Sequence, residues 1–250
     1  MISLSKVSKN YGGNIAVRDL SFHIPKGQFV AVVGGSGSGK TTALKMVNRL
    51  VEPDDGVVTV GGRPVRDVSV HELRRGIGYV FQGIGLFPHF TVAENIASVP
   101  RLLDWGEADI AKRVADLLDL VNLPKGYSER MPAALSGGER QRVGVARALA
   151  ASPSIMLMDE PFGALDPVTR DELGRAYRAL HDRLDLTTIM VTHDVQEAVL
   201  LADRILVMQA GRIIADGAPR TLLTDTGPAA ALMQTPRRQA ERIAGMLRDD

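Results

Sequence analysis

A glycine-rich segment, residues 34–41, constrains this chain more than any other part of its sequence. It follows the apolar run 29–33 and matches the pattern G-x-x-x-x-G-K-[S/T], ending on Lys40 and Thr41. Such glycines let backbone N–H groups converge on phosphate oxygens, and the helix that follows adds a dipole favouring anions. The alternative is a chance glycine-rich turn, but the flanking strand and helix patterns favour a phosphate-binding loop. Lys40 would then reach the β- and γ-phosphates and Thr41 would bind Mg²⁺, in a kinase, a GTPase or an ATPase.

The composition excludes several classes of protein. The chain has 250 residues, 45% of them apolar, which is enough for one or two globular domains. Its 30 basic and 29 acidic residues nearly cancel, so net charge alone would not hold it to nucleic acid. It has no cysteine, which excludes disulfides and thiolate sites. No run approaches the ~20 apolar residues that span a bilayer, and the first residues lack a secretion signal. We therefore expect a cytoplasmic protein that reaches a membrane only through a partner.

Short apolar runs alternate with longer helical patterns, which predicts an α/β fold with a largely parallel sheet. A small antiparallel layer is expected near the start of the chain, where turns are predicted at residues 54–56 and 61–62. A helix is expected at about residues 41–50, after the phosphate loop. Buried strands are predicted at residues 29–33, 155–158 and 188–191, and a hairpin at residues 205–208 and 213–215.

The middle of the chain has a different pattern. From residue 107 to residue 121 apolar side chains recur at helical spacing, at Ile110, Val114, Leu117, Leu118 and Val121. Helical character continues, with breaks, from about residue 92 to residue 151. We therefore expect a helical subdomain inserted into the α/β core.

Two carboxylates, Asp159 and Glu160, follow the predicted strand 155–158. In open α/β sheets ligands bind beyond the carboxyl ends of the strands, so this pair is expected near the phosphate loop. Adjacent residues of an extended segment point to opposite sides, which gives the two acids separate roles. Asp159 suits the Mg²⁺ shell, and Glu160 suits a base that polarises an attacking water. The alternative is that the two acids only end the strand and begin a turn.

A second cluster of accessible backbone donors lies at Ser136, Gly137 and Gly138, ahead of the helix-forming run 143–151. Its position predicts another anion site at a helix N-terminus. One nucleotide rarely needs two such sites from distant parts of one chain, so this second site requires an explanation.

That segment, Leu-Ser-Gly-Gly-Glu at residues 135–139, resembles the Leu-Ser-Gly-Gly-Gln signature of the nucleotide-binding subunits of ABC transporters, with Glu139 in the last place. The resemblance covers residues 2–220. It implies an α/β P-loop NTPase fold of the ABC type, with a RecA-like core, a small antiparallel β layer and an inserted helical subdomain. The implied boundaries are residues 1–235 for the ATP-binding domain and about 90–152 for the helical subdomain.

The resemblance also implies a role for each matching residue, with ATP and Mg²⁺ as cofactors. Glu160 and the switch histidine His193 would be catalytic, Asp166 would lie in the D-loop, and Ser136, Gly137, Gly138 and Glu139 would act in trans. The implied metal ligands are Thr41, Gln82 and Asp159. The implied ATP-binding residues are Tyr11, Gly34, Gly35, Ser36, Gly37, Ser38, Gly39, Lys40, Thr41, Thr42 and Gln82. Taken singly, Tyr11, Gln82 and His193 are also compatible with packing or solvated roles.

Partners follow from the same resemblance. Each anion site would form half of an ATP-binding site, so the working state implied is a head-to-tail dimer, expected to be a homodimer. Membrane-spanning permeases would bind near residues 82–89 and would hold the chain at the cytoplasmic face of the membrane. A substrate-binding protein would act indirectly, and no nucleic acid is expected.

Three further segments, residues 43–50, 78–89 and 158–167, resemble the quaternary-amine importer branch, which takes up glycine betaine, choline or carnitine. Importers in general share part of these segments. Many members of that branch carry C-terminal CBS domains, for which the residues after 220 are too few. The tail 236–250 is expected to be a solvated helix.

Other functions stay open at this point. The chain could energise import of an amino acid, a polyamine or an oxyanion instead. A soluble ABC protein of translation or DNA repair would require a second cassette or a long insertion, which the sequence lacks. A kinase would share the phosphate loop but would have no use for the second anion site.

Overall fold

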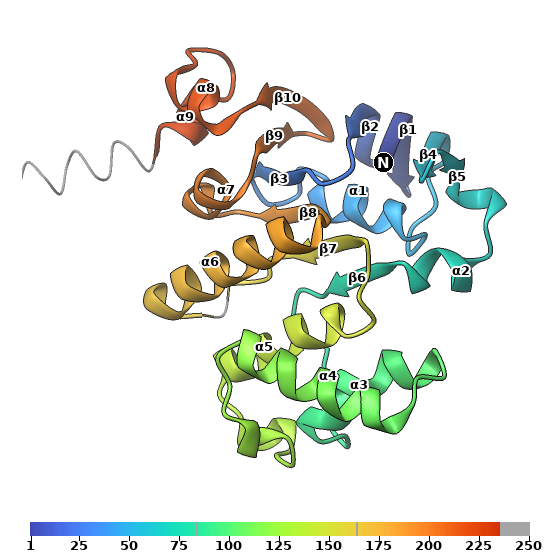
Figure 1. Ribbon diagram of the computed structural model, residues 1–250. Helices are drawn as coiled ribbons and strands as arrows, with labels where there is room; N and C mark the ends of the chain where they lie inside the picture. Colours follow the sequence, from blue (N-terminus) through green and yellow to red (C-terminus); the bar gives the residue numbers. More distant parts are fainter. Residues whose placement is uncertain (84, 164, 236–250) are drawn as a thin grey trace, which may run out of the picture.

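The computed structural model describes residues 1–83, 85–163 and 165–235, and it contains two sheets (Figure 1). The larger sheet has the strand order β10-β9-β3-β8-β7-β6. Neighbouring strands are parallel except β10, which is antiparallel to β9. The predicted α/β class with a largely parallel sheet is therefore confirmed. The strands are β3 (Phe29–Gly34), β6 (Ile77–Val80), β7 (Ile155–Asp159), β8 (Thr187–Thr192), β9 (Arg204–Gln209) and β10 (Arg212–Gly217).

Both faces of this sheet are covered, which is why its central strands are uninterrupted apolar runs. Every residue of β3, β7 and β8 is buried. Side chains of β3 alternate between two cores: Phe29, Ala31 and Val33 face one, whereas Val30 and Val32 face the other. The three predicted buried strands are thus confirmed.

The hairpin of β9 and β10 was also predicted correctly. Ala210 and Gly211, between the two strands, both have positive φ angles, +48° and +79°. Such angles are characteristic of the tight turns that match strand twist. The turn lies against the second sheet, because Arg18 N donates to Gly211 O at 2.9 Å.

The second sheet is antiparallel, in the order β2-β1-β4-β5, and confirms the small layer expected near the start of the chain. A turn forms at residues 61–62 as predicted. The turn predicted at residues 54–56 is wrong, because only Asp54 lies in a bend and β4 already begins at Asp55. Gly56 has a φ of +83°, and a Cβ there would collide with the backbone of Lys6. Glycine at this position therefore lets the two neighbouring strands approach each other closely. The strands are β1 (Ile2–Tyr11), β2 (Asn14–Ile24), β4 (Asp55–Val60) and β5 (Arg63–Pro64).

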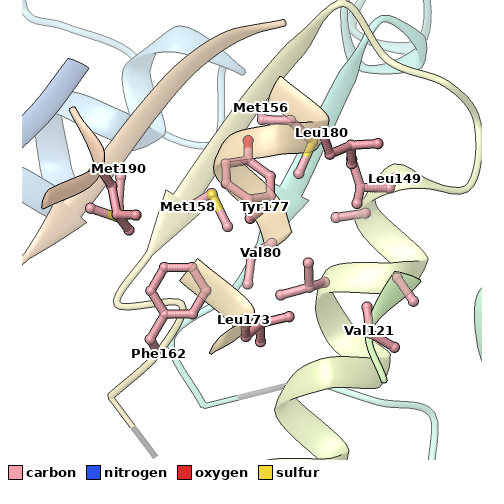
Figure 2. Packing of buried hydrophobic residues seen from close by; sticks show 14 of the residues in the cluster. Val80, Val121, Leu149, Met156, Met158, Phe162, Leu173, Tyr177, Leu180 and Met190 are labelled. Atoms are coloured by element: carbon pink, nitrogen blue, oxygen red, sulfur yellow. The ribbon is translucent and has the colours of Figure 1, made fainter. Parts of the chain in front are cut away.

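Helices cover the larger sheet. On one side α6 packs its buried face, including Leu173, Tyr177 and Leu180, against Met156 and Met158 of β7 (Figure 2). On the other side α1 packs between the two sheets through Leu44 and Met46. The helix predicted at 41–50 begins one residue earlier and ends sooner, because Arg49 adopts a left-handed φ of +54°. These helices are α1 (Lys40–Val47), α2 (Val70–Arg75), α6 (Pro167–Leu184), α7 (Val195–Leu201), α8 (Pro219–Thr224) and α9 (Ala230–Met233).

Three further helices, α3 (Val92–Leu102), α4 (Glu107–Leu120) and α5 (Gly137–Leu149), gather at one end of the molecule (Figure 1). The apolar face predicted for α4 is buried, and α5 begins earlier than the run 143–151 suggested. Short 3₁₀ turns lie at Val65–Asp67, Lys125–Tyr127 and Pro132–Ala134. The boundaries 1–235 and 90–152 stay predictions, and the tail 236–250 lies outside the described residues.

Membrane-spanning helices are not found among residues 1–83, 85–163 and 165–235. None of the helices there combines the length and the apolar character that crossing a bilayer requires.

Candidate functional site

The candidate site lies at one edge of the larger sheet, where parallel strands end side by side. Val33 of β3 pairs with Thr192 of β8, and Val191 of β8 pairs with Asp159 of β7. Val80 of β6 pairs with Met158. The segments that follow these strands therefore leave from the same edge, which is where ligands bind in such sheets.

The glycines of the phosphate loop are required by close approach of the backbone. Gly39 caps the N-terminus of α1 with a φ of +97°, and a Cβ there would collide with the Ala16 carbonyl oxygen of β2. A Cβ at Gly34 would collide with the Met208 carbonyl oxygen of β9. The loop is also tied to the β9–β10 turn, since Gly211 N donates to Ser38 O at 3.1 Å. Neighbouring backbone thus holds the loop from two sides.

Lys40 directs its ammonium group back over this loop. Its Nζ donates to the carbonyl oxygens of Gly34 and Gly35, each at 2.9 Å, and lies 3.4 Å from Ser38 Oγ. The residue is only 7% exposed. Burial lowers the pKa of Lys40, and the carboxylates of Glu160 and Asp159 act in the opposite direction. A partly desolvated cation is therefore held where the loop would surround a phosphate.

Thr41 and Asp159 meet at the base of the loop. The Thr41 hydroxyl donates to Asp159 Oδ1 at 3.0 Å, and Asp159 is 2% exposed. Burial is the largest cause of a raised pKa for Asp159, and the Thr41 hydrogen bond acts against it.

These two oxygens fit a Mg²⁺ site, because Mg²⁺ prefers oxygen ligands and usually takes one or two carboxylates together with phosphate oxygens. Within the described residues no group of three or more histidine, aspartate or glutamate side chains could hold a metal by itself. A metal here would accordingly depend on the phosphates of a bound nucleotide.

Glu160 and His193 lie next to each other at the ends of β7 and β8. Glu160 Oε1 and His193 Nδ1 are 3.4 Å apart, and the His193 side chain is 66% exposed. The expectation that Asp159 and Glu160 diverge because the segment is extended is wrong. Glu160 adopts a left-handed φ of +49°, stabilised by donation from its N–H to Val191 O at 2.9 Å. The two carboxylates do have different partners, Thr41 for Asp159 and His193 for Glu160. The left-handed backbone at Glu160 separates them, and not the alternation of an extended strand.

The second anion site lies at the N-terminus of α5. Ser136 is the N-cap: its Oγ accepts from Glu139 N at 3.2 Å, and Glu139 Oε2 accepts from Ser136 N at 2.7 Å. The bond from Ser136 N is the largest cause of a lowered pKa for Glu139. Tyr127 OH donates to Glu139 Oε1 at 3.1 Å. In the described chain no hydrogen bond or ion pair joins residues 136–139 to residues 34–41.

The remaining predicted residues lie on the periphery. Tyr11 ends β1, is 48% exposed, and has Lys9 Nζ 5.5 Å from its ring centre. Gln82 is exposed in the turn after β6. Asp166 caps α6 by accepting from Thr169 N at 3.0 Å, and that bond holds its pKa below the ordinary value. No residue of this group contacts Lys40 or Thr41 through a hydrogen bond in the described structure.

Two polar residues next to the site were not expected from the sequence. Gln141 of α5 is 3% exposed and donates to Pro161 O at 2.6 Å, one residue beyond Glu160. Arg170 of α6 forms an ion pair with Asp194, one residue beyond His193, at 3.0 Å. Both contacts join segments far apart in the chain, and no local pattern indicates them.

Replacing Gly39 with alanine should destabilise the chain. The left-handed φ and the Ala16 carbonyl together predict a loss of about 2 kcal/mol or more of unfolding free energy. Gly35→Ala is the matched control, because a Cβ there meets no atom within 4 Å. It should be neutral or stabilising by up to about 1 kcal/mol. Urea unfolding without nucleotide measures both, and equal effects would contradict this account of the loop.

Asp159→Asn should stabilise the chain at pH 7 without nucleotide or metal. The raised pKa of Asp159 means that its ionised form disfavours the folded state, so stability is lost as the pH rises from the ordinary value of 3.8 through the folded pKa. The advantage of asparagine should therefore shrink as the pH is lowered. Urea midpoints across this pH range test it, with the exposed Asp67→Asn as control. A less stable Asp159→Asn at pH 7 would contradict the claim that burial outweighs the Thr41 hydrogen bond.

This chain is similar to several proteins of known function. The ABC transporter family matches residues 17–163. A glycine betaine uptake system ATP-binding protein of Escherichia coli is 50% identical over 224 residues, which cover 90% of this chain and 73% of the relative. A choline transport ATP-binding protein of Bacillus subtilis is also 50% identical, over 89% of this chain but 59% of the relative.

Among solved structures, a dimeric ATP-binding cassette in a post-hydrolysis state, bound to ADP and Pi, aligns with a TM-score of 0.80. It is 32% identical, and the alignment covers 87% of this chain and 98% of that one. The family match extends from β2 to the segment after Glu160, and includes the phosphate loop and the second anion site at residues 136–139. The chain therefore belongs to the ABC transporter family of ATP-binding proteins.

Proposed function

We propose that this chain is the ATP-hydrolysing subunit that energises an ABC importer, with quaternary-amine osmoprotectants as the transported solutes. The observation that carries the ATPase part is the convergence of Lys40, the Thr41–Asp159 pair and the Glu160–His193 pair on one sheet edge. These pairs supply what phosphoryl transfer to water requires: a cation at the phosphates, oxygen ligands for a metal, and a carboxylate beside a histidine.

The proposed mechanism gives each residue one task. Backbone donors of residues 34–39 and the N-terminus of α1 bind the phosphates, and Lys40 neutralises charge on the β- and γ-phosphates. Thr41 and Asp159, together with Gln82 in this proposal, would hold Mg²⁺, which would supply positive charge beside the phosphates. Glu160 polarises the attacking water by accepting its proton. His193 donates a hydrogen bond to the γ-phosphate, and its contact with Glu160 aligns the two groups.

A second copy of the chain completes each site in this proposal. In the described structure the capping box uses the N–H groups of Ser136 and Glu139, which leaves those of Gly137 and Gly138 as the anion donors at the start of a 13-residue helix. They would bind the γ-phosphate held by the other copy, while Asp166 would lie at the seam and Tyr11 would stack on adenine. The dimeric state of the similar cassette bound to ADP and Pi supports this arrangement.

The permease contact is proposed at residues 82–89, of which Ile84 lies outside the described residues. Phe81, directly ahead of this segment, and Phe87, within it, are 42% and 43% exposed. The segment is anchored to α5, because Arg147 Nη1 donates to Gly85 O at 2.7 Å. A permease bound there would hold the chain at the cytoplasmic face of the membrane and connect it indirectly to a substrate-binding protein.

The solute class is inferred from the relatives. Proteins named for glycine betaine uptake and choline transport share half of their aligned residues with this chain. ATPase subunits do not contact the solute in this proposal, so the permease and the binding protein make the final selection. The ATPase and the solute class consequently need separate tests.

Glu160→Gln should bind ATP, hydrolyse it at least about 100-fold more slowly than the parent, and accumulate as a dimer with MgATP. Glutamine keeps the size of the side chain but cannot accept the proton of the attacking water. Phosphate release measures hydrolysis, and light scattering after gel filtration measures the dimer. Hydrolysis near the parent rate would show that Glu160 is not the base. A variant that binds ATP but stays monomeric would contradict the proposal that a second copy completes the site.

The solute class is tested by uptake after osmotic upshift in cells of the source organism that lack this gene and other osmolyte systems. Labelled betaine, choline and carnitine are the probes, with an unrelated amino acid as control. We expect loss of quaternary-amine uptake, restored by the parent chain but not by Lys40→Ala. Unchanged uptake would reject the solute class and leave the ATPase to be judged by phosphate release.

A further inference from the structure

The guanidinium of Arg170 joins two parts of the site that are distant in the sequence. Its Nη2 donates to Leu165 O at 3.1 Å, directly ahead of Asp166. Its Nη1 donates to Asp194 Oδ2 at 3.0 Å, directly after His193. One planar guanidinium group thus connects the start of α6 with the loop that carries His193.

A buried carboxylate lies beside the same guanidinium, at ion-pair distance and not at hydrogen-bond distance. Arg170 Nε is 3.6 Å from Glu197 Oε1, and the Glu197 side chain is only 7% exposed. The other oxygen of Glu197 accepts from Thr192 Oγ1 at 2.7 Å. Thr192 Oγ1 in turn accepts from Asp194 N at 3.0 Å. The polar network therefore encloses the residues on both sides of His193.

This network leaves the His193 backbone little freedom. Thr192 is the last residue of β8, paired with Val33, so the strand fixes its position. Asp194 is fixed twice, because one carboxylate oxygen caps α7 through Gln196 N at 2.8 Å and the other accepts from Arg170. His193 lies between these two residues with an exposed side chain whose Nδ1 is 3.4 Å from Glu160.

We propose that Arg170 is a positioning residue for ATP hydrolysis, which ties the segment ahead of Asp166 to the His193 loop and so keeps His193 beside Glu160. This inference rests on the proposed ATPase function. It predicts that loss of Arg170 slows the chemical step and leaves ATP binding intact, since Lys40 and Thr41 are on other elements. Misplacing a reacting group by about 1 Å can cost ~100-fold in rate.

The test uses the purified full chain and three variants. Arg170→Met removes the charge and all three contacts, and a cavity of ≈ 320 Å³ between α6 and α7 gives the new side chain room. Arg170→Lys keeps the charge but offers a point donor in place of the fork. Arg175→Met is the matched control, because Arg175 lies on the same helix, is 70% exposed and pairs only with Asp171 of that helix among its ion pairs in the described structure.

We expect Arg170→Met to lower kcat about 10- to 100-fold with KM for MgATP changed less than about twofold, and Arg170→Lys to recover part of the rate. Arg175→Met should stay within about twofold of the parent in both constants. A kcat for Arg170→Met within twofold of the parent, or a raised KM with unchanged kcat, would overturn the proposal.

A purely structural role is separated by a second variant. Arg170→Met leaves the buried Glu197 carboxylate without its cation, which lowers stability by itself. Adding Glu197→Gln removes that charge and keeps an oxygen that accepts from Thr192. We expect the double variant to regain the parent's melting temperature but not its kcat. Recovery of both would show that Arg170 serves only stability.

The histidine signals give a readout that does not require hydrolysis. The chain has five histidines, so ring resonances of labelled histidine can be assigned singly, with His193→Asn identifying His193. Arg170→Met should shift the His193 signal, while the buried His181 on the same helix stays unchanged because Thr188 and Gly27 hold its ring. An unshifted His193 signal would overturn the positioning role, whether or not the parent is an ATPase. A shifted signal in a parent that hydrolyses no ATP would reject the proposed ATPase function and leave the positioning role standing.

Discussion

The hydrogen bond from Thr41 to Asp159 joins residues 118 positions apart in the chain, and the site depends on the sheet register that makes it possible. Strand β8 lies between β3 and β7, and its pairing with both brings the phosphate loop and the acidic pair to the same edge. A slip of register in any of these strands would separate the two oxygens and would move buried side chains to the wrong core. The same register places His193 beside Glu160, so the proposed binding and the proposed chemistry share one structural cause.

This arrangement buries charge where an apolar site would be more stable. Desolvation lowers the pKa of Lys40 and raises that of Asp159, and both shifts oppose the ionised forms that phosphate and Mg²⁺ require. The loop carbonyls and the Thr41 hydroxyl offset part of that cost. Bound nucleotide would offset more, because its charges are complementary to the site. The fold therefore places two unfavourable charges where a ligand restores the balance.

The sequence predicted what is local or strongly periodic. Residues 29–33, 155–158 and 188–191 are uninterrupted apolar runs, and such runs occur in strands covered on both faces. Local pattern failed where another segment decides the conformation. Glu160 turns left-handed because Val191 O accepts from its N–H, and Gly56 lies inside a strand because it touches the backbone of Lys6. Arg170 was missed for the same reason, since its carboxylate partners, Asp194 and Glu197, come from another segment. The roles of the candidate site residues stay predictions until variants test them.

In the proposed mechanism two copies share each ATP, and mixing two inactive variants tests this sharing most directly. Lys40→Ala removes the cation of the phosphate loop. Gly137→Asp places a repelling carboxylate at the other anion site, where a Cβ meets no atom within 4 Å and an acidic residue suits the helix N-terminus. With random pairing about half of the dimers are mixed, and each mixed dimer has one intact composite site and one that lacks both functional halves. Phosphate release should therefore return to about a quarter of the parent rate. Activity no higher in the mixture than in either variant alone would contradict a site built from two chains.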